Sequence, residues 1–240
     1  MEERSMEQKT KASPAGRILR IGVTGGIGSG KSLVMEILEE EHGAKIILSD
    51  QVAHELMEPG AKSYQDILAA FGEEILKEDR TIDRTKLSAI VFSDPDKLSK
   101  LNGITHPNAI QEIRDRMAAF AREAAPGAGQ NETNDPVSIT TRDQGQELRI
   151  IAVESALLLE AGMDQDFDSF WYVWADPEVR VRRLMEGREY TEDRARAVMA
   201  SQKDDSYYRD RCQVVIDNSA GRQETAAQVD RAIQACRNGN

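Results

Sequence analysis

Cysteine is scarce in this sequence of 240 residues, which has only Cys212 and Cys236, with no metal-ligand spacing between them. A disulfide framework is therefore not expected, and the chain is predicted to reside in the reducing cytoplasm. Long apolar runs are also missing, since none approaches the roughly 18 residues that a membrane span needs. Residues 1–17 lack an apolar signal region and carry too many acids for a transit peptide, so a flexible, solvated tail is expected there.

Positive charge is in deficit as well. The formal net charge is −11, which argues against broad nucleic-acid binding because such binding normally needs a basic face. Phosphorylated small molecules are not excluded, since they need only local positive charge. With 40% apolar and 30% charged residues, the composition is that of a soluble globular protein. We expect a monomer that binds neither nucleic acid nor membrane, with one main core and room for an insertion.

Glycine, in contrast, is concentrated at one place. The stretch GGIGSGKS, residues 25–32, fits the pattern G-x-x-x-x-G-K-[ST] without a gap. It follows an apolar, strand-like run at 18–23 and opens a helix-like run at 32–43, which is the context that a phosphate-binding loop requires. An incidental glycine-rich turn would not combine this pattern with this placement. The sequence therefore predicts a P-loop.

The residue types in this loop suit a nucleoside triphosphate. Glycines allow successive N–H groups to converge on one anion, and the helix N-terminus adds partial positive charge. Lys31 is expected to reach the β- and γ-phosphates, and the Ser32 hydroxyl to ligate Mg²⁺. No N-K-x-D segment for reading guanine is present, so ATP is favoured over GTP. The predicted ATP-binding residues of the loop are Gly25, Gly26, Gly28, Ser29, Gly30, Lys31, Ser32 and Leu33.

Short apolar runs and helical patterns alternate over most of the chain. A strand, a helix and a second strand at its start favour a parallel sheet with a right-handed crossover, and hence an α/β fold. A polar stretch at 126–147, rich in Gly, Asn and Pro, is expected to be a loop insertion. Five strands are predicted, at 18–23, 44–50, 148–155, 168–176 and 212–221. Helices are predicted at 32–43, 50–58, 61–76, 83–92, 95–104, 106–125, 177–188 (Pro177 in its first position), 191–202 (Thr191 as N-cap) and 222–237.

Two acids follow predicted strands and are candidates for chemistry. Asp50 ends the second strand, at the edge where ligands of open α/β sheets gather, so its carboxylate could take the proton of an acceptor hydroxyl. From position alone it could equally be the N-cap of the following helix. Glu154 follows the apolar run RIIAV, a usual place for a residue that holds Mg²⁺ through water. It could equally be an acid in the first turn of a following helix.

The chain as a whole resembles the dephospho-CoA kinases. The resemblance covers about residues 18–235, without 126–147. The glycine loop alone would be shared by many kinases, whereas Asp50 together with MEPG, THP and IDNSAG is much more specific. The segments that carry the resemblance, in order and spacing, are VTGGIGSGKS, LSDQVAHELMEPG, TIDRTKLSAIVFSD, ITHPNAI, ALLLEAGM, RRLMEGREYT and VVIDNSAG.

This resemblance implies ATP-dependent phosphorylation of the ribose 3′-hydroxyl of dephospho-CoA, giving CoA and ADP in the last step of CoA biosynthesis. It also implies a P-loop NTPase of nucleoside-monophosphate-kinase-like architecture, a three-layer α/β sandwich with a five-stranded parallel sheet. ATP and dephospho-CoA would be the partners, with Mg²⁺ accompanying ATP. The implied parts are a nucleotide-binding core at 18–50, 148–176 and 212–240, a helical CoA-substrate domain at 51–125 and a lid region at 177–211.

Roles for single residues are also implied by the resemblance. Asp50 becomes the expected base for the 3′-hydroxyl, and Arg84 and His106 fall in the substrate domain. Arg183 and Arg188 fall in the lid region, where guanidinium groups would close on the transferring phosphoryl group. The implied catalytic residues are Asp50, Lys31 and Arg188. The implied ATP-binding set also includes Arg183 and Asn218, with Asn218 near the adenine. The acceptor would be bound by Asp50, Arg84 and His106, and the metal would be held by Ser32 and, through water, by Glu154.

Each of these residues also has a simpler reading. Arg84 could be a solvated helix charge, and His106 before Pro107 could simply begin the long helix. One of the two lid arginines could be a surface residue, and Asn218 could serve a tight turn.

The sequence departs from the family pattern in three places. Many members carry Asp-Ala-Asp where this chain has Leu48-Ser49-Asp50, which retains the acid that the chemistry needs but alters its electrostatic surroundings. The common Pro-Leu-Leu is Ala156-Leu157-Leu158 here, and the stretch at 126–147 is extra. Two other functions stay open: another small-metabolite or nucleotide kinase of the same fold, and a nucleotide-binding regulatory module without catalysis.

Overall fold

Five strands form one parallel sheet. The computed structural model describes residues 17–123, 148–156 and 158–238, so the loop predicted at 126–147 and the tail predicted at 1–17, apart from Arg17, lie outside the described residues. The strand order is β2-β3-β1-β4-β5, and all neighbouring strands are parallel, which confirms the predicted sheet. The strands are β1 (Ile18–Thr24), β2 (Lys45–Leu48), β3 (Arg149–Glu154), β4 (Ser169–Trp174) and β5 (Val214–Asp217).

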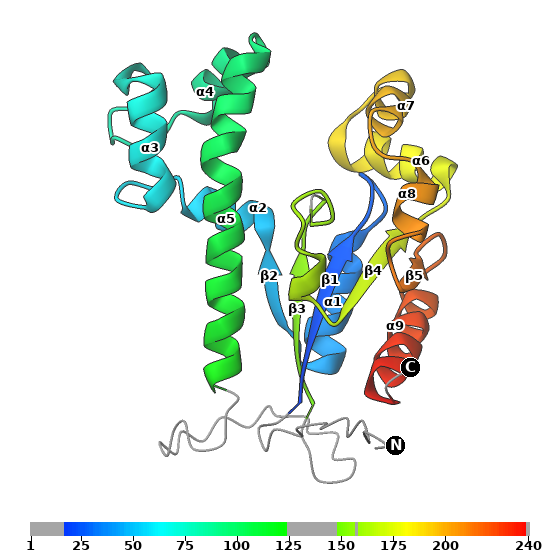
Figure 1. Cartoon of the computed structure of the whole chain (residues 1–240). Coiled ribbons are helices and arrows are strands. Elements are labelled where there is room, and N and C mark those ends of the chain that lie inside the picture. Colours follow the sequence, from blue (N-terminus) through cyan, green and yellow to red (C-terminus); the bar gives the residue numbers. More distant parts are fainter. Residues whose placement is uncertain (1–16, 124–147, 157, 239–240) are drawn as a thin grey trace, which may run out of the picture.

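Helices cover both faces of the sheet and give the three predicted layers (Figure 1). Side chains alternate between the faces along each strand. On one face, Ile21 of β1 belongs to a core shared with α1 (Lys31–His42) and α9 (Arg222–Asn238). On the other face, Val153 of β3 belongs to a core shared with α5 (Pro95–Glu123). Burial on both faces explains why the strands are almost continuously apolar in sequence.

The α5 helix is a single element of 29 residues, which corrects the prediction of two helices at 95–104 and 106–125. Pro107 lacks a backbone donor, and this loss suggested a break. Packing on both sides of the proline outweighs the loss of this one hydrogen bond, because Ile104 contacts the core of α3 and α4 while Ile113 lies in the sheet core. His106 therefore lies in the middle of a helix and does not begin one.

The segment before α5 forms a small helical layer with a core of its own. Ile67 and Leu87 are buried in that core, which packs against the N-terminal half of α5. A buried hydrogen bond of 3.1 Å from the Asn108 amide to the Ser63 hydroxyl also joins α5 to α3. The short helices are α2 (Ser49–Glu55), α3 (Lys62–Phe71), the 3-10 helix η1 (Glu73–Ile75) and α4 (Arg84–Phe92).

The segment after β4 also folds into helices. Pro177 occupies the start of α6, and the Thr191 hydroxyl accepts a hydrogen bond from the Arg194 amide, so both predicted start signals are confirmed. The short α8 and the 3-10 helix η2 (Asp164–Asp166) were not predicted from the sequence. The elements are α6 (Pro177–Arg188), α7 (Glu192–Ala200) and α8 (Asp205–Arg209).

The two helical segments stand on opposite sides of the strand ends (Figure 1). The α3–α4 pair lies beside the upper part of α5, and the α6–α7 pair lies above β1 and β4. Ligands of open parallel sheets bind at the carboxyl ends of the strands, so this edge is the expected place of the functional site. No helix in the described part of the chain is long and apolar enough to cross a membrane.

Candidate active site

The glycine loop between β1 and α1 has the backbone that its sequence predicts. Gly25, Gly28 and Gly30 have φ angles of +155°, +75° and +87°, in the left-handed region that favours glycine. A Cβ at Gly25 would lie 2.5 Å from the carbonyl oxygen of Val173, so the loop passes too close to β4 for a side chain. Gly30 forms the N-cap of α1, which directs the helix N-terminus into the loop.

The carbonyl groups of the loop accept hydrogen bonds from backbone and side-chain groups of the loop and of α1, and from side chains of later elements. The Lys31 ammonium donates to Gly25 O at 2.9 Å, and the Ser29 amide donates to Gly26 O at 3.3 Å. The carbonyls of residues 27 to 30 accept hydrogen bonds from Arg180, from Arg183, from the Asn218 amide and from the amide of Leu33.

Several amide groups of the loop, in contrast, have no such partner. Among the residues that the structure describes, none accepts a hydrogen bond from the amides of Gly28, Gly30, Lys31 or Ser32. Consecutive unpaired N–H groups at a helix N-terminus form an anion-binding concavity. The loop is therefore built to hold phosphate groups, as the motif predicts.

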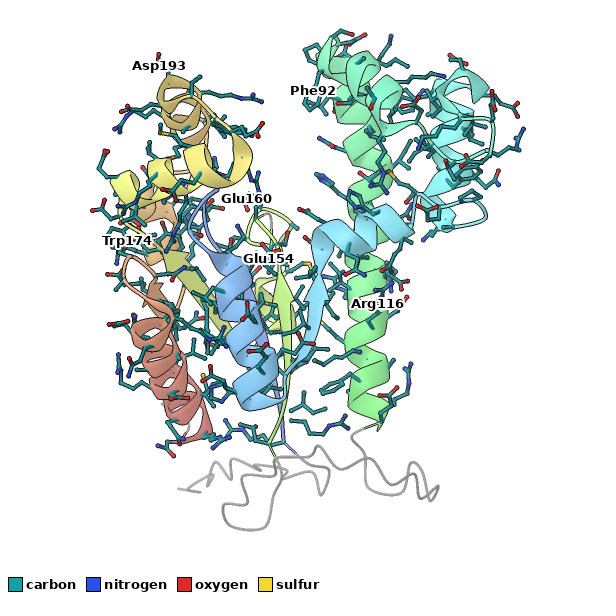
Figure 2. All side chains as sticks on the ribbon, turned by 180° about the vertical axis from the view of Figure 1, so that it is seen from behind. Phe92, Arg116, Glu154, Glu160, Trp174 and Asp193 are labelled. Carbon is teal, nitrogen blue, oxygen red and sulfur yellow. The ribbon has the colours of Figure 1, made fainter. Side chains whose placement is uncertain are left out.

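Lys31 connects the loop to the end of β3. Its Nζ lies 3.5 Å from Oε1 of Glu154, and both side chains are mostly shielded from solvent. Burial raises the pKa of Glu154; the positive charge of Lys31 opposes that shift, while the negative charge of Asp50 adds to it. Figure 2 shows Glu154 at the carboxyl ends of the strands, between α1 and α2. The loop lysine, Glu154 and Asp50 thus share one electrostatic environment.

Asp50 lies in the first turn of α2, because β2 ends two residues earlier, at Leu48. The prediction that Asp50 ends a strand over 44–50 is therefore wrong by two residues. The N-cap reading is also wrong, since Leu48 occupies that position. Because the helix follows the short strand directly, the exposed carboxylate of Asp50 still lies at the carboxyl edge of the sheet, where the prediction required it.

A cavity of about 240 Å³ opens beside Asp50. His106 from the middle of α5 lines it together with Asp50, so two predicted acceptor-binding residues from distant parts of the sequence meet at one cavity. The remaining wall is largely apolar and includes Ile110, Leu158 and Met163. A site with few polar groups in an apolar wall is typical of small-molecule binding.

The other predicted acceptor and lid residues lie at exposed positions. Arg84 is at the start of α4, 3.8 Å from the carboxylate of Glu58, and lines a separate surface hollow. Arg188 ends α6, and within the described part of the chain it makes no hydrogen bond or ion pair. The structure therefore does not bring these two arginines to Asp50, and their roles stay predictions. Ser32 is exposed in the first turn of α1.

Arg183 and Asn218 contact the carbonyl groups of the loop. Asn218 is only 1% exposed, its amide donates to Ser29 O at 2.8 Å, and its carbonyl accepts a hydrogen bond from Thr225 at 3.0 Å. Arg183 donates to Asn218 O at 2.8 Å and reaches the carbonyls of Gly28 and Ser29 at longer distances. Both residues support the loop, and their predicted contacts with ATP stay predictions.

Two residues of this site were not predicted from the sequence. Arg180 and Gln202 bind the peptide groups of Ile27 at the tip of the loop. The spacing of Arg180, three residues before Arg183 on α6, is a signal that could have revealed it, because such residues share a helix face. Gln202 follows α7, and nothing in its local sequence distinguishes it.

A substitution at Gly30 tests the architecture of the loop. A Cβ there would lie 2.0 Å from the buried Asn218 amide, and the φ of +87° strains any other residue. Gly30→Ala should weaken Mg·ADP binding at least about 10-fold by calorimetry, from roughly 1–3 kcal/mol of backbone strain. Gly187→Ala is the matched control, since that glycine is helical and a Cβ there meets nothing. Equal ADP affinity in the two variants would contradict this reading of the loop.

A parallel sheet with helices on both faces and a phosphate-binding loop after its first strand defines a P-loop NTPase fold. The family model for dephospho-CoA kinase matches residues 19–126 and 137–224. The chain belongs to the dephospho-CoA kinase family, and it is accordingly an ATP-dependent kinase.

Relatives and solved structures agree with this membership. A dephospho-CoA kinase of Corynebacterium glutamicum is 37% identical over 216 residues, which cover 90% of this chain and 96% of the relative. One from Geobacter metallireducens is 38% identical, covering 88% and 94%. The structure of TT1252 from Thermus thermophilus matches with a TM-score of 0.67 at 25% identity, covering 91% and 97%. Dephospho-CoA kinase from Campylobacter jejuni has the same fold, with a TM-score of 0.57 at 22% identity over 90% and 96%.

Proposed function

We propose that this kinase transfers the γ-phosphoryl group of ATP to the ribose 3′-hydroxyl of dephospho-CoA, giving CoA and ADP. The observation that carries the proposal is the position of Asp50 and His106 at one cavity, next to a carboxylate that is paired with the loop lysine. Phosphoryl transfer depends mainly on positioning and on neutralising negative charge, with one group to orient the nucleophile. This chain supplies each of these requirements.

In this proposal the glycine loop binds the phosphate groups of ATP. The unpaired amides of Gly28 and of residues 30 to 32 bind the β- and γ-phosphate oxygens, and Lys31 neutralises the charge that develops between them. Lys31 is held for this role from two sides, by the carbonyl of Gly25 at 2.9 Å and by the carboxylate of Glu154 at 3.5 Å. A lysine fixed in this way needs little reorganisation when the triphosphate binds.

The acceptor binds in the cavity between α2, α5 and the segment after β3. Asp50 accepts the proton of the 3′-hydroxyl as that oxygen attacks the γ-phosphorus, and His106, which lines the same cavity, contacts the bound acceptor. Arg84 of the α3–α4 layer binds a more distant part of the acceptor, and Arg188 approaches the phosphoryl group when the α6–α7 segment closes.

The oxygen donors at this edge suit Mg²⁺. No cluster of three or more His, Cys, Asp or Glu side chains in the described residues forms a complete metal cage. This fits a metal that takes one or two protein ligands and otherwise waters and phosphate oxygens. The Ser32 hydroxyl and, through water, Glu154 would hold the ion, whose bound form supplies positive charge to the β- and γ-phosphates. Arg183 and Asn218 complete the ATP set in this proposal.

One assay separates the three functions that the sequence left open. ADP release from ATP is followed with dephospho-CoA, with other alcohol acceptors such as nucleosides, and with no acceptor. The proposal expects turnover that requires dephospho-CoA. Turnover with another acceptor only would instead identify a different small-molecule kinase, and nucleotide binding without turnover would identify a regulatory module. Monomeric state and cytoplasmic location belong to the same proposal and can be checked by light scattering and by fractionation.

A further inference from the structure

One residue at the tip of the phosphate-binding loop, Ile27, is held through all three of its groups by the segment after β4. Its amide donates to Oε1 of Gln202 at 2.9 Å, and its carbonyl accepts from Nε of Arg180 at 2.8 Å. Its side chain packs against the small core that contains Leu184 of α6 and Ala195 of α7. No contact of this kind follows from the glycine motif itself.

The two residues that hold Ile27 are also bonded to each other. Nη2 of Arg180 donates to the same Gln202 oxygen at 3.0 Å, so that oxygen accepts two hydrogen bonds. The guanidinium group lies directly against the loop, since a Cβ at Gly26 would come within 2.4 Å of Nη2. A planar guanidinium presents donors in a fixed fork, which a lysine could not reproduce.

The surroundings of Arg180 also affect its charge. It is half-buried, and burial lowers its pKa, while the negative charge of Asp205 favours its charged form. The rings of Tyr172 and Tyr208 stack with centroids 4.8 Å apart. These groups come from β4 and α8, two elements that do not belong to the loop. Arg180 itself contacts the loop and Gln202, so it joins the loop tip to the segment after β4.

The amide of Ile27 already donates a hydrogen bond to Gln202, so the phosphates must be bound by the amides that follow Ile27 in the chain. We infer that Arg180 and Gln202 are positioning residues, which fix the peptide groups of Ile27 so that the amides of Gly28 and of residues 30 to 32 converge on nucleotide phosphate. Through Leu184 and Ala195, the same contacts couple the packing of α6 and α7 to nucleotide binding. This inference rests on the proposed function only in taking the bound anion to be a nucleotide.

Three variants and one control test it. Arg180→Lys, Gln202→Leu and the double variant are compared with Arg182→Lys, which changes an exposed arginine of the same helix. Mg·ADP affinity is measured by calorimetry, and KM values for ATP and dephospho-CoA are measured separately. Each single variant should weaken ADP binding about 10-fold, in line with one charge-assisted hydrogen bond. The double variant should lose little more, because both residues hold one peptide.

A positioning role and a merely structural role predict different changes in the two KM values. Positioning raises the KM for ATP about as much as it weakens ADP binding, while the KM for dephospho-CoA stays within about 2-fold. Unchanged ADP affinity in both single variants would overturn the inference, as would a parallel rise of both KM values with a loss of thermal stability. ADP binding does not depend on the acceptor. If the wild-type chain binds ADP but does not phosphorylate dephospho-CoA, the proposed function fails while this test still gives its answer.

Discussion

Lys31→Met should reduce kcat by roughly 10³-fold, the scale expected when a preorganised positive group is removed from a phosphoryl-transfer site. The ammonium group of Lys31 lies 3.5 Å from Glu154 and 2.9 Å from the carbonyl of Gly25, so its direction is fixed before the nucleotide arrives. Methionine keeps the length of the side chain and removes the charge and the donors. Steady-state kinetics with ATP and dephospho-CoA give the size of the loss.

The matched control is Lys45→Met. Lys45 is exposed at the start of the edge strand β2 and takes no part in the loop, so kcat should stay within about 2-fold. Thermal unfolding of both variants separates lost chemistry from lost folding. A Lys31→Met enzyme that retained more than about a tenth of the wild-type kcat would contradict the assigned role of this lysine.

The second large effect is expected at Asp50. Asp50→Asn keeps the shape of the side chain but cannot take a proton, so kcat should fall at least ~10²-fold, a typical contribution of a general base. Asp50 lies on α2 beside the acceptor cavity and forms no part of the glycine loop, so Mg·ADP affinity should remain nearly unchanged. The two measurements together distinguish a base from a structural carboxylate.

Asp66→Asn provides the control for this substitution, because Asp66 is an exposed acid on α3 away from the cavity. Its kcat and nucleotide affinity should match those of the wild type. If Asp50→Asn weakened ADP binding as strongly as it lowered kcat, Asp50 would be part of the nucleotide site and the acceptor would need another base.

The nucleotide half of the site was largely predictable because its signal is local. A run of eight residues specifies the loop conformation, and its φ angles and helix N-cap follow the motif. The acceptor half was harder to predict, because Asp50 and His106 share a cavity only after α5 has packed on the sheet. Pro107 misled the helix prediction there, since the loss of one hydrogen bond is outweighed by burial on both sides.

The sequence by itself determined the parallel sheet, the phosphate-binding loop and, through its resemblance, the family. These depend on patterns that neighbouring residues complete among themselves: apolar runs, glycines that adopt positive φ, and a lysine at a fixed offset. Only the tertiary structure decided that Arg180 and Gln202 hold Ile27, and that Asn218 is buried beneath the loop. Those contacts join residues 153, 175 and 189 positions apart in the chain, so no local pattern encodes them.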